Sequence, residues 1–407
     1  MRILVYGINY HPELTGIGKY TGELCVWFAE RGHHVEVVTA MPYYPGWEVE
    51  REYKGRKWFT EEISGVRVRR SPLYVSTRIN AKKRIVHEFS FLLSSLVQWI
   101  RPLWTRYDVV ISIYPPLVIG LYPYIYKLIH KRPWVFHIQD LQVDAAKELG
   151  MIKNSFVLNC LFSIERFFLN RATRVGSISP GMKQKILNKG VAEKKYVDLP
   201  NWVDTGFIYP TAKDERLKKE LGFGPEDRLI LYSGNMGEKQ GLELVIEVAE
   251  QMRAIPHLHF LMAGEGASRE RLEEQVKKIQ LTNVHFLPLM PYSELTRFMN
   301  IADAHLVLQK REASDLVLPS KLNTILSAGG LAIVSAVKDT TLYNLVREHN
   351  VGIVIEPESA AALRDAIEEA IEHPHTEIRS NARNYALENL NIDKILGRFE
   401  TQLKELL

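Results

Sequence analysis

The sequence predicts a two-domain α/β protein in which each domain is a doubly wound, Rossmann-like sheet. Three observations lead to this fold class. With 407 residues, the chain is longer than one compact core usually holds and fits two domains of about 200 residues. Short β-prone runs alternate with helical patterns along the chain. The order of strand, glycine-bearing loop and helix seen in the first forty residues begins again at Arg228.

The first half alternates strands and helices. Arg2–Tyr6 is apolar and β-prone, and Tyr20–Arg31 places apolar residues at helical spacing before Gly32 ends the helix. Such alternation indicates parallel strands joined by crossover helices. The further elements expected are strands at His34–Thr39, Val66–Arg69, Val109–Ile113 and Trp134–Ile138, and a helix at Phe156–Asn170.

The second half repeats this pattern after a proline-bounded stretch, Leu199–Pro210, that has no clear periodicity. We predict a first domain over residues 1–204 and a second over 205–379. Ligands of open α/β sheets bind at the carboxyl ends of the strands, so a cleft between the domains is expected. The strands predicted here are Arg228–Ser233, His257–Ala263, Val284–Leu287, Ala304–Leu308, Ala332–Ser335 and Gly352–Ile355.

Composition narrows the class of protein. The two cysteines, Cys25 and Cys160, are too few for a disulfide framework, and a reduced compartment is expected. The N-terminus does not resemble a signal peptide. The longest nearly apolar stretch, Phe89–Ile100, is shorter than the ~20 residues that cross a bilayer. We therefore expect a cytoplasmic protein that does not span the membrane.

Charge is distributed unevenly along the chain. Residues 1–200 hold 29 Lys and Arg against 17 Asp and Glu, which leaves 23 against 31 in the remainder. Opposite net charges indicate that the two halves meet different partners, although a chance distribution of solvated charge is the alternative. The basic excess is greatest over Arg51–Arg106, with 13 basic and 4 acidic residues.

Within this basic segment, Lys82, Lys83 and Arg84 precede an apolar run. This order suits a helix that lies on the surface of an anionic membrane. A buried helical hairpin with a solvated basic edge would produce the same pattern. Nucleic-acid binding would use similar chemistry, but no motif for it is present, and we expect none.

Two glycine-bearing loops are candidate phosphate sites. Gly16 and Gly18, within Thr15–Lys19, would let backbone N–H groups approach a phosphate at a helix N-terminus. The glycines stand too far from the first strand for a dinucleotide fingerprint, which disfavours a dehydrogenase, and a purely structural turn explains them equally well. In the second half, Gly234 and Gly237 open a similar turn, and Lys239 offers a cation to a diphosphate.

Ser320 and Lys321 add a hydroxyl group and a second cation at the start of a predicted helix. A solvated surface lysine is the simpler interpretation of Lys321. Asp140 ends a predicted strand of the first half, where it would accept a hydrogen bond from a sugar or stabilise positive charge at an anomeric carbon. It would equally serve as a helix cap, and the neighbouring His137 fits either the site or the core.

No Asp-x-Asp pair or His/Cys cluster offers ligands for a metal, so no metal cofactor is expected. If a diphosphate leaves in the reaction, lysines and helix dipoles must stabilise its charge.

Five motifs, in this order and at similar spacing, resemble those of glycosyltransferase family 4: Tyr6–Tyr20, His137–Asp140, Pro200–Trp202, Tyr232–Gly241 and Leu318–Lys321. More narrowly, the chain resembles the fucosyltransferases of bacterial colanic acid and other exopolysaccharide clusters. The resemblance runs from the first strand to the last helices. It implies the GT-B fold and transfer of a sugar, with retention, from a GDP- or UDP-linked donor.

The resemblance also implies partners. The second domain would bind the nucleotide sugar, and the first would bind a polyprenyl-diphosphate-linked saccharide at the inner face of the cytoplasmic membrane. Such proteins usually end in a helix that returns to the first domain, which we assign to 380–407. The acceptor hydroxyl would attack from the side of the departing diphosphate, while Lys239, Lys321 and loop N–H groups stabilise the leaving charge. Domain closure would exclude water.

Residue by residue, Gly16 and Gly18 match the family's glycine loop near the donor phosphates. Gly234, Asn235, Lys239 and Gln240 match its phosphate loop, although many relatives have an Arg and a Lys at the positions of Asn235 and Gln240. Lys239 would replace them as the cation.

Three further positions depart from the family pattern. The two glutamates that many relatives use correspond to Leu316 and Thr324 here, so Ser320 and Lys321 are expected to take over donor binding. Gln139 stands where many relatives have a histidine that contacts the donor sugar.

Two rival functions remain open on the sequence. A nucleotide-sugar 2-epimerase shares the architecture but needs acid/base carboxylates and no lipid acceptor. A non-catalytic, sugar-nucleotide-binding scaffold of a polysaccharide assembly complex would explain the missing glutamates.

Overall fold

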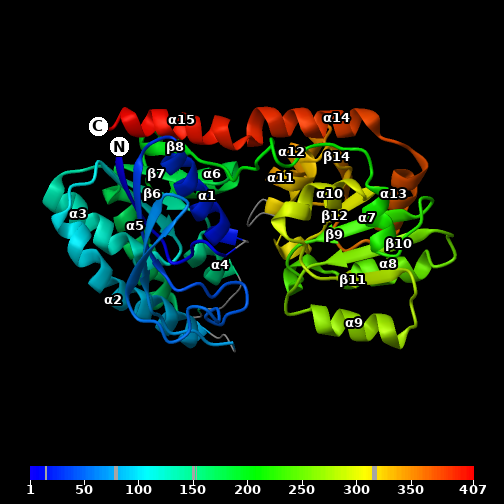
Figure 1. Ribbon diagram of the computed structural model, residues 1–407, viewed down its shortest axis with the longest axis horizontal. Coiled ribbons are helices and arrows are strands. Elements are labelled where there is room, and N and C mark those ends of the chain that lie inside the picture. Colours follow the sequence, from blue (N-terminus) through cyan, green and yellow to red (C-terminus); the bar gives the residue numbers. More distant parts are fainter. Residues whose placement is uncertain (14–15, 78–80, 149–151, 153, 314–318) are drawn as a thin grey trace. The chain divides into compact units, whose positions relative to one another are not determined.

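A computed structural model of the chain describes all residues except 14–15, 78–80, 149–151, 153 and 314–318. The chain forms two compact units, Met1–Pro200 with Leu396–Leu407 (unit 1) and Asn201–Ile395 (unit 2). Each unit is built on its own sheet (Figure 1). The predicted fold class, two Rossmann-like α/β domains, is confirmed.

Unit 1 contains an eight-stranded sheet in the order β3-β4-β2-β1-β5-β6-β7-β8. All neighbouring strands are parallel except β3, which runs antiparallel to β4 at one edge. The strands are β1 (Arg2–Tyr6), β2 (His34–Ala40), β3 (Phe59–Ile63), β4 (Val66–Ser71), β5 (Val109–Tyr114), β6 (Trp134–Ile138), β7 (Arg174–Ser177) and β8 (Tyr196–Asp198).

The helices of unit 1 follow the strands as crossovers. They are α1 (Gly16–Glu30), α2 (Ala81–Trp104), α3 (Leu121–His130), α4 (Gln142–Glu148), α5 (Ser155–Arg171) and α6 (Pro180–Asn188). Asn154 begins α5 by accepting the N–H groups of Phe156 and Val157, and Ser179 begins α6 in the same way.

An aromatic layer holds α2, α3 and α5 against one face of this sheet. Tyr6 of β1 stacks on Phe91 of α2, with 5.6 Å between ring centroids, and lies 6.0 Å from Tyr122 of α3. Phe136 of β6 meets Phe168 of α5 at 6.4 Å. All five rings are buried, so the three helices share one core with the sheet.

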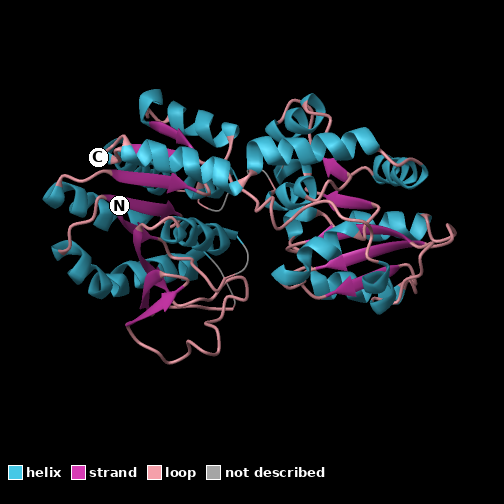
Figure 2. Cartoon of the chain, turned by 45° about the horizontal axis from the view of Figure 1, so that its top comes forward, coloured by secondary structure: helices cyan, strands magenta, loops and turns pink. Residues whose placement is uncertain are grey.

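Unit 2 contains a six-stranded, fully parallel sheet in the order β11-β10-β9-β12-β13-β14. Its strands are β9 (Arg228–Ser233), β10 (Leu258–Ala263), β11 (Val284–Leu287), β12 (Ala304–Val307), β13 (Ala332–Ser335) and β14 (Gly352–Ile355). Its helices are α7 (Glu215–Glu220), α8 (Glu243–Gln251), α9 (Arg269–Lys278), α10 (Leu295–Asn300), α11 (Ser320–Ser327), α12 (Thr341–Glu348), α13 (Ala360–Glu372) and α14 (Thr376–Tyr385). Figure 2 shows helices on both faces of the sheet.

The unit boundaries differ from the predicted domain boundaries, above all near the end of the chain. The segment that rejoins unit 1 starts at Leu396 within α15 (Ile392–Lys404), not at residue 380. The reason is that α14 belongs to the core of unit 2, where Ala382 is fully buried. Arg383 also donates hydrogen bonds to the carbonyl oxygens of Ser327 at 2.7 Å and Ile208 at 3.0 Å. The first boundary falls after Pro200 rather than after residue 204.

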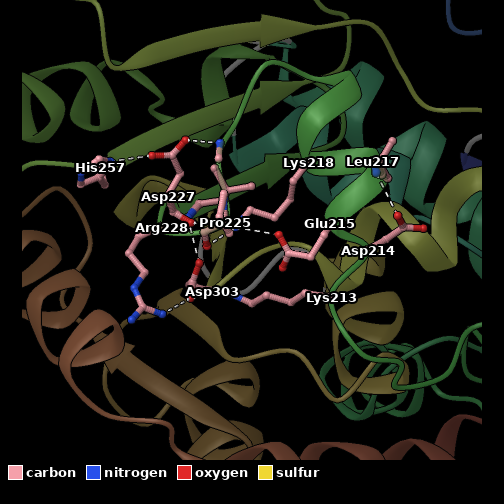
Figure 3. A network of polar contacts seen from close by, with 12 residues as sticks. Lys213, Asp214, Glu215, Leu217, Lys218, Pro225, Asp227, Arg228, His257 and Asp303 are labelled. Carbon is pink, nitrogen blue, oxygen red and sulfur yellow. Dashed lines mark hydrogen bonds and ion pairs between the residues drawn. The ribbon is translucent and has the colours of Figure 1, made fainter.

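A polar network closes the start of β9 in unit 2 (Figure 3). Asp303, which is 6% exposed, accepts a hydrogen bond from the backbone N–H of Leu229 at 2.9 Å. It also pairs with Lys213 Nζ at 2.7 Å and Arg228 Nη1 at 3.2 Å. Because this cluster lies at the amino end of β9, it stabilises the edge of the sheet opposite the loop that follows the strand.

Candidate functional site

In unit 2, two glycine turns at the carboxyl ends of β9 and β10 pack closely against each other. The N–H of Gly234 donates to the carbonyl oxygen of Ala263 at 2.9 Å. Gly264 has φ of +144°, and a Cβ on it would lie 1.9 Å from the carbonyl oxygen of Gly234. Gly266 has φ of +152°, and a Cβ on it would lie 2.4 Å from the carbonyl oxygen of Met236. Only glycine fits at both positions.

The N–H groups of this loop are largely used within the protein. Gly234 donates to Ala263, and Gly237 donates to Gln240 Oε1 at 3.1 Å. These two N–H groups therefore already have acceptors, and the assignment of Gly234 and Gly237 to donor binding stays a prediction. Gln240 serves through Oε1 to hold the shape of the loop. The charge of an anion at this loop must then be met mainly by cationic side chains.

Lys321, in the first turn of α11, points against the glycine turn that follows β9. Its Nζ lies 3.6 Å from the ring centroid of Tyr232 and 3.2 Å from the position that a Cβ on Gly234 would take. The Nζ is buried and has no hydrogen-bond partner among the described residues. The φ of +140° at Gly234 favours glycine in the turn, and a side chain there would press against the end of Lys321.

Burial lowers the pKa of Lys321 from 10.5 to about 7. Part of the Lys321 side chain is accessible, but the amine itself is buried and lies over the face of the Tyr232 ring. The Tyr232 ring would favour a cation here, but no carboxylate or other hydrogen-bond acceptor among the described residues contacts the amine. A bound anion would supply the missing counter-charge. The interpretation of Lys321 as a solvated surface lysine is wrong.

The other predicted donor residues of unit 2 lie on the same loop as Gly234 or on the same helix as Lys321. Asn235 and Lys239 are exposed on the loop, and Ser320 is exposed as the first residue of α11. The carbonyl oxygen of Lys239 accepts the N–H of Lys310 at 2.8 Å, which fixes the tip of the loop. The structure therefore brings the predicted loop and the predicted helix start together through Lys321.

In unit 1, the first glycine loop contains a buried carboxyl group that the sequence did not reveal. Glu13, 2% exposed, accepts the backbone N–H groups of Tyr43 at 3.1 Å and Tyr44 at 3.0 Å, and the side-chain amide of Asn9 at 2.9 Å. A Cβ on Gly18 would lie 2.5 Å from Glu13 Oε2. Burial raises the pKa of Glu13 to about 7.

This carboxyl group changes the role of Gly18. The space beside Gly18 is filled by Glu13, so the glycine is explained by internal packing, and the predicted phosphate contact at Gly18 is not supported. Gly16 begins α1 with φ of +62° and is exposed, while the predicted loop residue Thr15 lies outside the described residues.

Asp140 follows β6 at the carboxyl edge of the sheet, as predicted, and is half-buried. His137 is 2% exposed, and burial lowers its pKa to about 3, so it is a neutral core histidine. Its Nε2 lies 2.8 Å from the side-chain amide of Gln139, which is buried beside it. Of the His137–Asp140 motif, Asp140 is the residue that reaches the edge.

Arg84, near the start of α2, is linked through Glu88 to the segment that follows Asp140. Arg84 Nε donates to Glu88 Oε1 at 3.3 Å, and Glu88 also accepts the side-chain amide of Gln142, which follows Asp140. Lys83 Nζ donates to Ser76 Oγ at 3.1 Å, and Lys82 is exposed. Residues predicted separately for acceptor and membrane contact are thus linked to the loop of Asp140.

Three residues of these sites were missed on the sequence. Gly264 and Gly266 could have been found, because a Gly-x-Gly pair directly follows the predicted strand that ends at Ala263. Glu13 gave no signal, since its partners lie on the loop after β2. Of the two positions without the family's glutamates, Thr324 lies on α11, and Leu316 lies outside the described residues.

Two Rossmann-like units, each built on a largely parallel sheet, form the architecture of the GT-B class of glycosyltransferase structures. The chain matches the family model "Glycosyl transferase 4-like domain" over residues 15–202 and "Glycosyl transferases group 1" over residues 213–389. The chain belongs to this glycosyltransferase family.

A curated relative supports that membership, and solved structures share the fold. The chain is 39% identical over 411 residues to an Escherichia coli (strain K12) protein named as a colanic acid biosynthesis glycosyl transferase, WcaI, covering 99% of this chain and 100% of that protein. Its fold matches sucrose-phosphate synthase from Thermosynechococcus elongatus (TM-score 0.76, 19% identity, 100% and 99% coverage). It also matches Anabaena HepE in complex with UDP (TM-score 0.73, 15% identity, 100% of both chains).

Proposed function

We propose that this glycosyltransferase moves a sugar from a nucleoside diphosphate onto a lipid-linked saccharide, as a step in the assembly of a bacterial exopolysaccharide like colanic acid. The observation that carries the donor part is the buried, unpartnered Nζ of Lys321 beside the glycine turn. The process is taken from WcaI, the similar protein named for colanic acid biosynthesis.

For the donor we propose GDP-fucose, on the resemblance to fucosyltransferases. UDP-hexoses are the alternative, because HepE, which shares the fold, was solved with UDP. The proposed transfer retains the anomeric configuration, and an oxygen of the leaving diphosphate takes the proton of the acceptor hydroxyl. Lys321 and Lys239 would stabilise the leaving charge, so the reaction would not need a metal ion.

The acceptor part of the proposal rests on unit 1. Glu88 links Arg84 to the segment after Asp140, and Lys82, Lys83 and Arg84 would meet the diphosphate of a lipid carrier there. Asp140 would orient the acceptor hydroxyl or stabilise positive charge at the anomeric carbon.

The donor proposal is tested by thermal unfolding with GDP, UDP, ADP, GDP-fucose and UDP-hexoses, each with and without EDTA. We expect one base to raise the melting temperature selectively, and EDTA to leave the rise unchanged. Turnover that requires a lipid-linked saccharide would then exclude a 2-epimerase. Nucleotide binding without turnover on any acceptor would instead favour the scaffold.

Replacing Asp140 with asparagine is expected to leave donor affinity within about twofold while lowering the rate of transfer about 100-fold, because it removes a charge from the reacting groups but not from the donor loop. Isothermal titration and steady-state kinetics measure the two effects. Asp108→Asn is the matched control, since Asp108 accepts the N–H of Arg2 at the other edge of the sheet. Full activity of the Asp140 variant would contradict its role in transfer.

A further inference from the structure

The outer surface of unit 1 carries most of the chain's exposed large apolar side chains. Among the described residues, 15 of 22 lie on the helices α2, α3 and α5. We call these the apolar surface: Ile85, Val86, Phe89, Leu93, Leu96, Val97, Ile100 and Trp104 on α2, Leu121, Leu128 and Ile129 on α3, and Phe156, Val157, Ile164 and Phe167 on α5. Exposed apolar patches of this extent mark sites of interaction.

Helix α2 is apolar on two sides. Phe91 and Trp99 face the sheet and are fully buried. Leu93, Ile100 and Trp104 are 68%, 56% and 87% exposed, and their spacing places them on one stripe along the opposite side. A helix that served only to cover the sheet would be polar on this side. The sheet explains one side of α2, and the other still lacks a partner within the described structure.

Hydrogen bonds tie the three helices into one surface. Tyr122 of α3 donates through its hydroxyl to the carbonyl oxygen of Leu92 on α2 at 2.9 Å. Lys127 of α3 donates to the carbonyl oxygen of Arg171 at the end of α5 at 2.7 Å. All three also share the aromatic core with the sheet, so their outer sides are held in a fixed relation.

The exposed charges on the described parts of these helices are basic. Seven basic residues lie on them: Lys82, Lys83, Arg84, Arg101, Lys127, Arg166 and Arg171. The described part of these helices holds two acidic residues, and neither presents a free carboxylate on the surface. Glu88 forms an ion pair with Arg84 and accepts a hydrogen bond from Gln142. Glu165 is 1% exposed and forms an ion pair with Lys189. The surface is therefore apolar and cationic, without an exposed carboxylate among its described residues.

We infer that the apolar surface is where unit 1 lies on an anionic lipid bilayer, with α2, α3 and α5 in the plane of the interface. Side chains such as Leu93 and Trp104 enter the acyl boundary, while the basic residues meet anionic headgroups. The inference deepens the proposed function, because it names the surface that brings the enzyme to a lipid-linked acceptor. No helix in the described part of the chain has the length and apolar character to cross a bilayer.

A second copy of the chain fits this surface less well. Two copies joined through the same face would set seven cations against seven cations, without carboxylates to neutralise them. An anionic bilayer satisfies both the apolar and the cationic side chains. The apolar surface also extends beyond Lys82–Arg84. Salt screens charges but does not weaken the insertion of apolar side chains, so part of the binding to vesicles should persist at high salt.

The test is co-sedimentation of the full chain with vesicles of phosphatidylcholine and phosphatidylglycerol at low and high salt. We expect a bound fraction that persists at high salt. The double variant Leu93→Glu/Ile100→Glu should bind the vesicles at least about tenfold more weakly at both salt concentrations. Tyr209→Glu, at a tyrosine 45% exposed in unit 2, should bind like the unchanged protein. Replacing Lys82, Lys83 and Arg84 with glutamate should reduce binding chiefly at low salt.

Either of two results would overturn the inference: no binding of the unchanged protein to vesicles, or undiminished binding of the double variant. A third contradicting result would come from light scattering without lipid. It would be a dimer of the unchanged protein and a monomer of the double variant, because the apolar surface would then join two copies of the chain. Thermal shifts with nucleotides, measured on the same variants, separate this inference from the proposed function. Vesicle binding with no response to any nucleotide would count against the transferase proposal alone.

Discussion

Replacing Lys321 with alanine is expected to weaken the binding of a nucleoside diphosphate about 30- to 100-fold. The amine lies directly against the Gly234 turn, and charge-assisted hydrogen bonds to phosphate contribute about 1.5–3 kcal/mol. Isothermal titration with the nucleotide that stabilises the protein measures the change. Lys277→Ala, at an exposed lysine of α9, is the control. Equal affinities in the two variants would remove Lys321 from the site.

The same residue should destabilise the protein when no ligand is bound. Its pKa is about 7 in the folded chain and 10.5 ordinarily, so between these values the unfolded state binds more protons, and stability rises with pH. Below pH 7 the folded protein holds the buried charge, and the full penalty applies. Lys321→Met should therefore raise the melting temperature at pH 6–7 while abolishing nucleotide binding, and its advantage should shrink towards pH 10. A lower melting temperature for this variant would contradict the burial.

Binding should also be coupled to protons. A diphosphate favours the charged amine, so affinity is expected to be highest below pH 7 and to decline as pH rises above it. At pH 8 the protein should take up close to one proton with each nucleotide, seen as a dependence of the binding enthalpy on the ionisation enthalpy of the buffer. Lys321→Arg, whose guanidinium stays charged, should lose this dependence.

The second large effect is expected at Gly264. An alanine there would place Cβ 1.9 Å from the carbonyl oxygen of Gly234, on a backbone with φ of +144°. Relief requires the two turns to separate, which we expect to cost about 2–5 kcal/mol and to displace the turn that Lys321 contacts. Both the melting temperature and nucleotide affinity should fall.

Gly222→Ala is the matched control for Gly264→Ala. Gly222 also has a positive φ, +91°, but no atom lies within 4 Å of its Cβ position. It should show the backbone strain alone, about 1 kcal/mol, with unchanged nucleotide affinity. If both variants behaved alike, the contact between the turns would be unimportant.

The strands were predictable because the residues that mark each strand and its ends lie next to one another in the sequence. Trp134–Ile138 and Arg228–Ser233 were predicted with the bounds that the structure has, since β-branched and apolar runs end at turn residues. The end of the chain was predicted less well: helix α14 reads as a polar helix, and nothing in its own sequence shows that Ala382 enters the core of unit 2.

The sequence predicted which kinds of side chain the site contains, but not what surrounds each of them. The pattern around Lys321 indicated a cation at a helix start, but its contact with Tyr232 depends on how α11 packs beside β9. Glu13 was missed altogether. Gly18 was predicted to leave space for a phosphate, but the Glu13 carboxyl group, held by an N–H group of the loop after β2, fills that space. Likewise, the sequence of α2 allowed either a membrane surface or a buried hairpin, and exposure distinguishes its two sides.

Unit 1 is not a continuous stretch of chain, and this bears on how the protein matures during synthesis. Phe399 is 1% exposed and lies 6.2 Å, between ring centroids, from Phe28 of α1, while Glu400 lies 2.8 Å from His33 Nε2. The ribosome makes these residues after all of unit 2. The first unit to be translated is thus the last to be completed, and α1 waits with an uncovered apolar side while unit 2 emerges. A fragment that stops at Pro200 should accordingly aggregate unless residues 396–407 are supplied as a separate peptide.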